Sequence, residues 1–151
     1  MGLGLALSSF AALADNPPKK RREKTYFPRL GEIMNGEVQS RHLKIWLAGH
    51  NANWQLTAYE IRELKETVED IERYQPIWRG RPIAKMMEKT MNPPLQALEK
   101  AVDKKDSAAF EKAYRDFTAS CNSCHESVHY AFIAVDIPSG NPFSNQKFDS
   151  E

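Results

Sequence analysis

The apolar residues of one stretch of this chain recur at alternating steps of three and four, which is the spacing of a single face of an α-helix. The face comprises Trp54, Thr57, Ile61, Leu64, Val68 and Ile71. Charged side chains such as Glu60, Glu63 and Glu66 fall on the other faces. A helix that has one apolar face must bury it against other helices or a sheet, so this stretch predicts a bundle helix.

Three further stretches show the same rhythm. The first begins near Pro28 and ends around Gly49, with an expected apolar side made of Leu30, Met34, Val38, Arg41, Ile45 and Ala48. A third follows Pro82 and has Ile83, Met87, Met91, Leu95, Leu98 and Val102 on one face, and Pro93-Pro94 should kink or restart it. The fourth runs through Phe110, Tyr114, Phe117, Cys121, Cys124 and Val128, with Asp106 or Ser107 as its N-cap.

The connections between these helices are short, which favours antiparallel neighbours. We therefore predict an all-α fold, an up-down-up-down antiparallel four-helix bundle over residues 28–133 with no sheet. Residues 134–151 contain Pro138, Gly140 and Pro142 and predict an irregular C-terminal tail. Phe143 and Phe148 are expected to pin that tail onto the bundle.

Cys121-Asn122-Ser123-Cys124-His125, near the end of the fourth stretch, is the pattern that accepts a covalently attached haem. Each thiol adds across one vinyl group of the porphyrin to form a thioether, and the adjacent imidazole ligates the iron from one face. The motif predicts one haem c, with Cys121 and Cys124 as attachment points and His125 as the axial iron ligand.

The motif has two other interpretations. A redox disulfide between Cys121 and Cys124 is typical of an α/β context, which is missing from the pattern of this chain. A zinc site of Cys121, Cys124, His125 and His129 has suitable ligand types, but adjacent Cys124 and His125 are poorly spaced for tetrahedral coordination. The chain has two cysteines in total, so no disulfide framework competes for them.

Residues 1–14 are apolar and end in Ala12-Leu13-Ala14, which is typical of a secretory signal and its cleavage site. The stretch is too short to span a bilayer and lacks the positive charges that open such a signal, so a truncated signal with a start further upstream is also considered. A retained amphiphilic tail is the alternative. Export fits the motif, because covalent haem attachment takes place outside the bacterial cytoplasm, and predicts a periplasmic protein.

The net charge of +1 at pH 7 argues against nucleic acid as a partner. Residues 15–27 form a polar basic segment that includes Lys19, Lys20, Arg21 and Arg22. This cluster is interpreted as a solvated tail, with docking to an acidic partner or lipid as the alternative.

The antiparallel topology suggests a residue for the distal side of the iron. His125 lies about six residues before the end of its helix, which at ~1.5 Å per residue matches the level of Met34 on the first helix. Methionine sulfur is a usual partner of histidine on haem iron. Met86 and Met87 reach the same level from the third helix, Met87 as pocket wall. His42 and His50 are expected to be surface or helix-end histidines.

The bundle pattern with the motif in its last helix resembles the cytochrome c′ family and its six-coordinate relatives over Phe27 to Phe132. The resemblance implies thioethers at Cys121 and Cys124, His125 as proximal ligand, a distal residue at the position of Met34, and a homodimer as a frequent assembly. Val128 and His129 depart from the aromatic and basic residues that often follow the motif. His129 is interpreted as a helix-end histidine, or as a partner of a haem propionate.

These observations predict a periplasmic one-electron carrier that exchanges electrons with redox partner proteins and performs no enzymatic chemistry. The alternative is a five-coordinate haem protein that binds small gases such as nitric oxide or carbon monoxide behind apolar walls from Ile33, Val38 and Met87. A peroxidase lacks an assignable distal pair of histidine and arginine.

Overall fold

The computed structural model describes residues 26–150 of the chain. The predicted signal at residues 1–14 and the basic cluster at Lys19–Arg22 lie outside the described residues.

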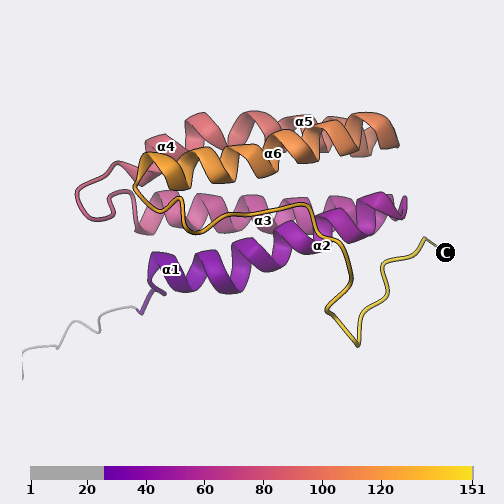
Figure 1. The fold of residues 1–151 in the computed structure, drawn as a ribbon, viewed down its shortest axis with the longest axis horizontal. Helices are drawn as coiled ribbons and strands as arrows, with labels where there is room; N and C mark the ends of the chain where they lie inside the picture. Colours follow the sequence, from indigo (N-terminus) through magenta and orange to yellow (C-terminus); the bar gives the residue numbers. More distant parts are fainter. Residues whose placement is uncertain (1–25, 151) are drawn as a thin grey trace, which may run out of the picture.

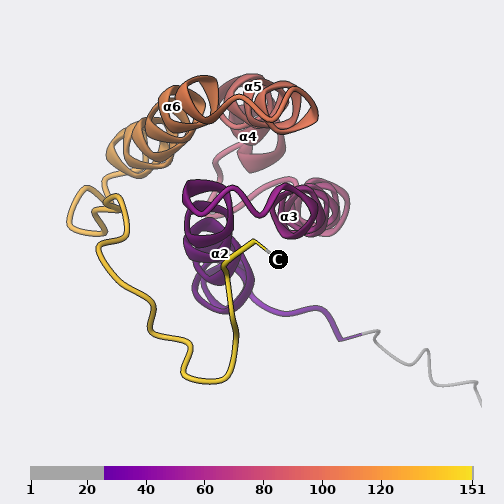
Figure 2. The ribbon, with the colours of Figure 1, turned by 90° about the vertical axis from the view of Figure 1, so that its right-hand side faces the viewer.

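The described residues form an antiparallel four-helix bundle, as the periodicity predicts (Figure 1). The first helix is continuous through α1 (Leu30–Ile33), the π-helical turn η1 (Met34–Val38) and α2 (Gln39–His50), and the second is α3 (Trp54–Tyr74). The third consists of α4 (Ile83–Thr90) and α5 (Asn92–Asp103), and the fourth is α6 (Ser107–Ser127). Viewed from one end, α2 and α3 form one layer and α4, α5 and α6 the other (Figure 2).

The helix boundaries have local causes in the sequence. The Asn53 side chain accepts a hydrogen bond from the Leu56 N–H at 3.2 Å and caps α3. The Asp106 carboxylate accepts from the Ala109 N–H at 3.0 Å and caps α6, as predicted. Pro93 and Pro94 lie in the first turn of α5, where the missing proline N–H groups cost no helical hydrogen bond, so the third helix restarts after Met91.

The apolar faces predicted from the sequence meet in one core. Phe110, Tyr114 and Phe117 of α6 are fully buried, and so is the face of α3 from Thr57 to Ile71. Trp46 is also buried, while Trp54 and Trp78 pack against the core as half-buried side chains. The three tryptophans therefore serve core packing.

Gly49 lies near the end of α2, where the helix approaches the Phe110 ring so closely that an added Cβ would collide with it. We expect Gly49→Ala to lower the free energy of unfolding by about 1–3 kcal/mol, because the buried ring must move to admit the methyl group. Gly36→Ala is the matched control, since nothing lies within 4 Å of a Cβ at that position. Urea unfolding of the two variants measures the difference, and equal stabilities would contradict the close approach.

Leu30, Val38, Ile45 and Ala48 of the first helix are buried, as predicted. The turn η1 adds one residue to the helical repeat between them. The buried residues Ile33, just before η1, and Val38, the last residue of η1, are five positions apart. Beyond η1 the buried face continues through His42 and not through Arg41, which had been expected on the apolar side.

Arg41 faces α3 and pairs with Glu60 at 2.6 Å and Glu63 at 3.3 Å. Glu60 is therefore almost completely buried, contrary to its expected place on an outer face. A buried carboxylate needs such a partner, because an unpaired charge in the core would be costly.

The C-terminal segment, residues 128–150, leaves the end of α6 and returns along the bundle toward its opposite end (Figure 1). Phe148 is buried, and Phe143 packs against it with ring centroids 6.0 Å apart. The Asn53 side chain donates to the carbonyl of Asp149 at 3.0 Å. The two phenylalanines therefore pin the irregular tail onto the bundle, as predicted.

Candidate functional site

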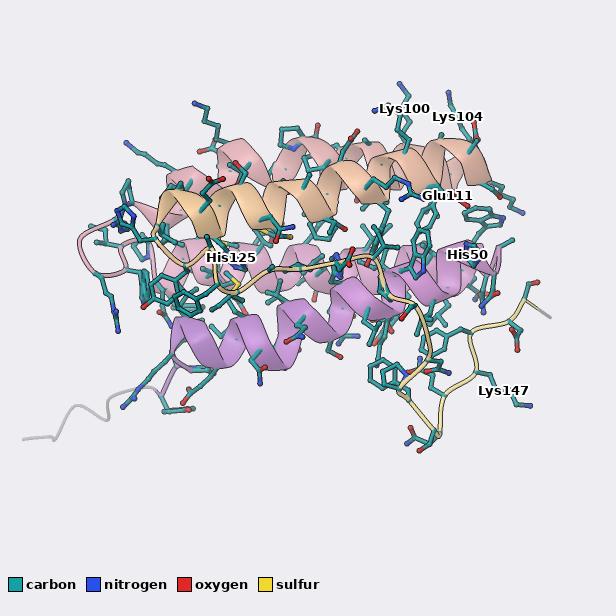
Figure 3. The ribbon with its side chains drawn as sticks, viewed as in Figure 1. His50, Lys100, Lys104, Glu111, His125 and Lys147 are labelled. Atoms are coloured by element: carbon teal, nitrogen blue, oxygen red, sulfur yellow. The ribbon has the colours of Figure 1, made fainter. Side chains whose placement is uncertain are left out.

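The residues of the predicted haem motif lie together at one end of the bundle, on the last two turns of α6. Figure 3 shows His125 at this end. Cys121, Cys124 and His125 are half-buried and line a cavity of about 270 Å³ between α6, the first helix and α4. The other walls are mainly apolar and include Met34, Val38, Met87, Met91, Val128 and Val135. A mainly apolar cavity with few polar groups suits a flat hydrophobic cofactor.

Both thiols are free in the structure. Burial raises the pKa of Cys121 to about 12, and the neighbouring Cys124 contributes to the same shift. Burial also raises the pKa of Cys124. The two side chains therefore rest as neutral thiols against an apolar cavity, which is where haem vinyl groups would lie.

The zinc interpretation finds no support among residues 26–150, since no three metal-binding side chains of His, Cys, Asp or Glu converge there. His129 lies beyond the end of α6, has a positive φ of 65°, and is exposed. It does not line the cavity, in agreement with its interpretation as a helix-end histidine.

The His125 ring is oriented by the C-terminal segment. Its Nδ1 lies 2.7 Å from the carbonyl oxygen of Ile133. A carbonyl oxygen can only accept, so Nδ1 carries the hydrogen and donates it, and the lone pair of the ring resides on Nε2. This is the tautomer that an axial ligand bound through Nε2 needs, and the arrangement fits the second shell of a metal-binding histidine.

The packing of α2 against α6 fixes the level of Met34. His42 contacts Thr118, and from this pair Met34 and His125 both lie about two helical turns toward the same end of the bundle, because the helices are antiparallel. Met34 is half-buried and lines the cavity. Its role as an iron ligand stays a prediction.

The third helix also supplies methionines to the cavity. Met87 is buried and lines it, whereas Met86 does not. Met91 also lines the cavity, which the sequence analysis does not predict, although its place on the same apolar face as Met87 indicates it. Ile33, expected as an apolar wall, is buried in the core and does not line the cavity.

His42 is buried between α2 and α6, which corrects its interpretation as a surface or helix-end residue. Its Nε2 lies 3.0 Å from the Thr118 hydroxyl and its Nδ1 2.9 Å from the Tyr114 hydroxyl. Both hydroxyls are also tied to the backbone, since Thr118 donates to the Tyr114 carbonyl at 3.0 Å and Tyr114 donates to the His42 carbonyl at 2.8 Å. The neutral His42 ring donates to one hydroxyl through one nitrogen and meets the other hydroxyl with the lone pair of its second nitrogen. Burial lowers the pKa of His42 to about 4 and raises that of Tyr114. This neutral network closes the inner end of the cavity, where His42 is a lining residue.

His50 behaves as predicted, since it ends α2 and its side chain is exposed, 3.7 Å from Glu111 (Figure 3).

A four-helix bundle with two thiols and an imidazole in one apolar cavity near the end of its last helix defines a c-type haem protein of the bundle class. The family model for cytochrome C′ matches residues 25–128, about two thirds of the chain. The chain therefore belongs to the cytochrome c′ family. No curated protein and no solved structure matched it.

Proposed function

We propose that this cytochrome c′ family member is an exported one-electron carrier with a single haem c, joined covalently to Cys121 and Cys124. When bound, the haem supplies a one-electron redox couple. The observation that carries the proposal is the pairing of His125 and Met34 at one level, on two helices that face the same cavity.

The side chains that line the cavity would have different roles. His125 would offer Nε2 from α6 and Met34 its sulfur from the first helix, so that both axial positions come from the protein. The apolar side chains of Val38 and Met87 would exclude water and lower the local dielectric constant, which together with axial ligation sets the potential of a haem.

Two observations support the proposal that the protein is exported. Proteins of this family are typically exported, and residues 1–14 have the composition of a secretory signal. Within the described residues no helix is both long and apolar enough to cross a membrane. We place the mature protein in the periplasm.

Exchange of electrons requires contact with a redox partner protein near the cavity. Large apolar side chains are exposed at the end of the bundle that contains His125, among them Tyr26, Tyr74, Ile77 and Phe132. Exposed apolar side chains gathered at one end are typical of a docking surface. We propose this end as the place of electron exchange.

Met34→Ala tests the axial assignment. We expect the variant to lose the sulfur ligand, to show a lower reduction potential, and to bind carbon monoxide rapidly when reduced. Met86→Ala is the matched control, because Met86 lies on α4 beside the cavity but does not line it. An unchanged absorption spectrum and potential in Met34→Ala would show that Met34 does not bind the iron.

The second candidate function is capture of small gases at a five-coordinate haem. The apolar cavity beside His125 favours it, since Val38, Met87 and Met91 would admit a neutral diatomic gas more readily than a charged ligand. Fast binding of carbon monoxide to the reduced wild-type protein would support this function over electron transfer.

A peroxidase reaction is not part of the proposal. His42 is the buried histidine nearest the inner end of the cavity, and both its ring nitrogens are engaged by Tyr114 and Thr118. Arg41 is held by Glu60 and Glu63. Neither residue is free to assist cleavage of a peroxide.

A further inference from the structure

Asn122, the residue after the first cysteine of the motif, holds the backbone of the C-terminal segment. Its Nδ2 donates to the carbonyl oxygen of Val135 at 2.8 Å, and its Oδ1 accepts from the Val135 N–H at 2.7 Å. Both hydrogen-bonding ends of the amide are thus used on one residue of the segment. No other side chain on α6 makes such a two-point contact with residues 128–150 of the described chain.

Val135 lies two positions beyond Ile133, whose carbonyl oxygen accepts a hydrogen bond from His125 Nδ1 at 2.7 Å. On the other side of Ile133, the Tyr130 N–H donates to the His125 carbonyl at 2.8 Å, and the Ile133 N–H donates to the Tyr130 carbonyl at 2.8 Å. The Ile133 carbonyl is therefore fixed from both directions along the chain, by the turn after α6 and by Asn122.

Asn122 and His125 are three residues apart and lie on neighbouring positions of the α6 surface. The segment is therefore held alongside the turn of α6 that carries the imidazole. Ile133 and Val135 both line the cavity. The contact between Asn122 and Val135, which we call the clamp, therefore forms part of the wall of the cavity.

We propose that Asn122 is a positioning residue for the axial histidine, because by holding Val135 it keeps the Ile133 carbonyl on His125 Nδ1. The inference rests on the proposed haem function of the same site. A carbonyl that accepts from Nδ1 strengthens Nε2 as a donor and fixes the rotation of the ring. A stronger donor favours the oxidised iron, so the clamp lowers the reduction potential.

The test uses the full haem-loaded chain and compares Asn122→Ala with the wild type. We expect a higher reduction potential and several-fold faster proteolysis within residues 134–150. We also expect a lower iron–histidine stretching frequency in the resonance Raman spectrum, recorded for the reduced protein with Met34→Ala added to each chain, because this stretching signal needs a five-coordinate iron. Asn122→Leu removes the same two hydrogen bonds and keeps a similar side-chain size. It replaces Asn122→Ala in the same measurements if Asn122→Ala does not fold.

Ser123→Ala is the matched control. Ser123 is the other residue between the two cysteines, it is exposed, and its side chain makes no hydrogen bond in the described structure. We expect it to keep the wild-type potential and the wild-type stretching signal.

A haem-loaded Asn122→Ala protein with the potential and stretching signal of the wild type would overturn this inference and leave the proposed function intact. A wild-type protein without haem would overturn the proposed function itself, and this inference with it.

Discussion

A chain in which serine replaces both Cys121 and Cys124 is expected to release all of its haem when it is denatured and extracted with acid. A serine hydroxyl does not add to a vinyl group under the conditions in which a cysteine thiol does, so no thioether forms and any haem is held by the cavity alone. The measurement is the haem absorbance that stays with the denatured chain after extraction, compared with that of the wild type.

The two single serine substitutions test this prediction at each cysteine separately. Cys121→Ser and Cys124→Ser should each keep the haem through one thioether, with one unsaturated vinyl group visible as a shift of the reduced absorption bands. Ser120→Ala, which changes a neighbouring residue on α6 outside the motif, should behave as the wild type. Haem that stays with the denatured double-serine chain would place the attachment elsewhere.

The free energy of unfolding is expected to fall by about 3 kcal/mol between pH 6.5 and pH 4 because of His42 alone. Burial lowers the pKa of His42 to about 4 in the folded protein, while the unfolded chain keeps the ordinary value of 6.5. Between these two values the unfolded chain binds a proton that the folded protein does not, so stability is full above pH 6.5 and is lost as the pH falls through this range.

The measurement is urea unfolding at several pH values in the wild type and in His42→Gln. Glutamine can both donate and accept a hydrogen bond at the two hydroxyls of Thr118 and Tyr114, but it has no titrating group in this range. The difference in stability between the two proteins should therefore change by about 3 kcal/mol over the range. Parallel curves would show that His42 is protonated equally in the folded and unfolded chains.

The fold could be predicted from the sequence because the signals for it are local and repeated. The apolar face from Trp54 to Ile71, the capping residue Asp106, and the restart at Pro93-Pro94 each follow from spacing and backbone chemistry, and all three are confirmed. The π-helical turn at Met34–Val38 could not be predicted in this way, because its stretch also reads as a regular α-helix.

Two of the wrong predictions concern neighbouring residues of α2, His42 and Arg41. His42 lies on the buried face, and Arg41 faces α3, where it pairs with the buried Glu60. Each of these residues can be placed on a helix from the sequence. The register between the helices, which brings their side chains into contact, cannot be read from it. Long-range pairing of polar side chains depends on that register, and periodicity alone does not determine it.

Part of the candidate site could likewise be predicted from the sequence, and part of it could not. The pattern from Cys121 to His125 is recognisable in the sequence, because the chemistry of thioether formation fixes both residue types and spacing. The contact between His125 and the Ile133 carbonyl involves a backbone atom, which leaves no mark on residue identity. Only the path of the C-terminal segment, held by Asn122, reveals it.

The most direct test of the account is the intact mass of the exported wild-type protein under denaturing conditions, followed by mapping of the peptide that contains Cys121 to His125. We predict the mass of the chain plus one haem, with the two thioether bonds on Cys121 and Cys124. Unmodified thiols, or a disulfide between the two cysteines with no added haem, would contradict it.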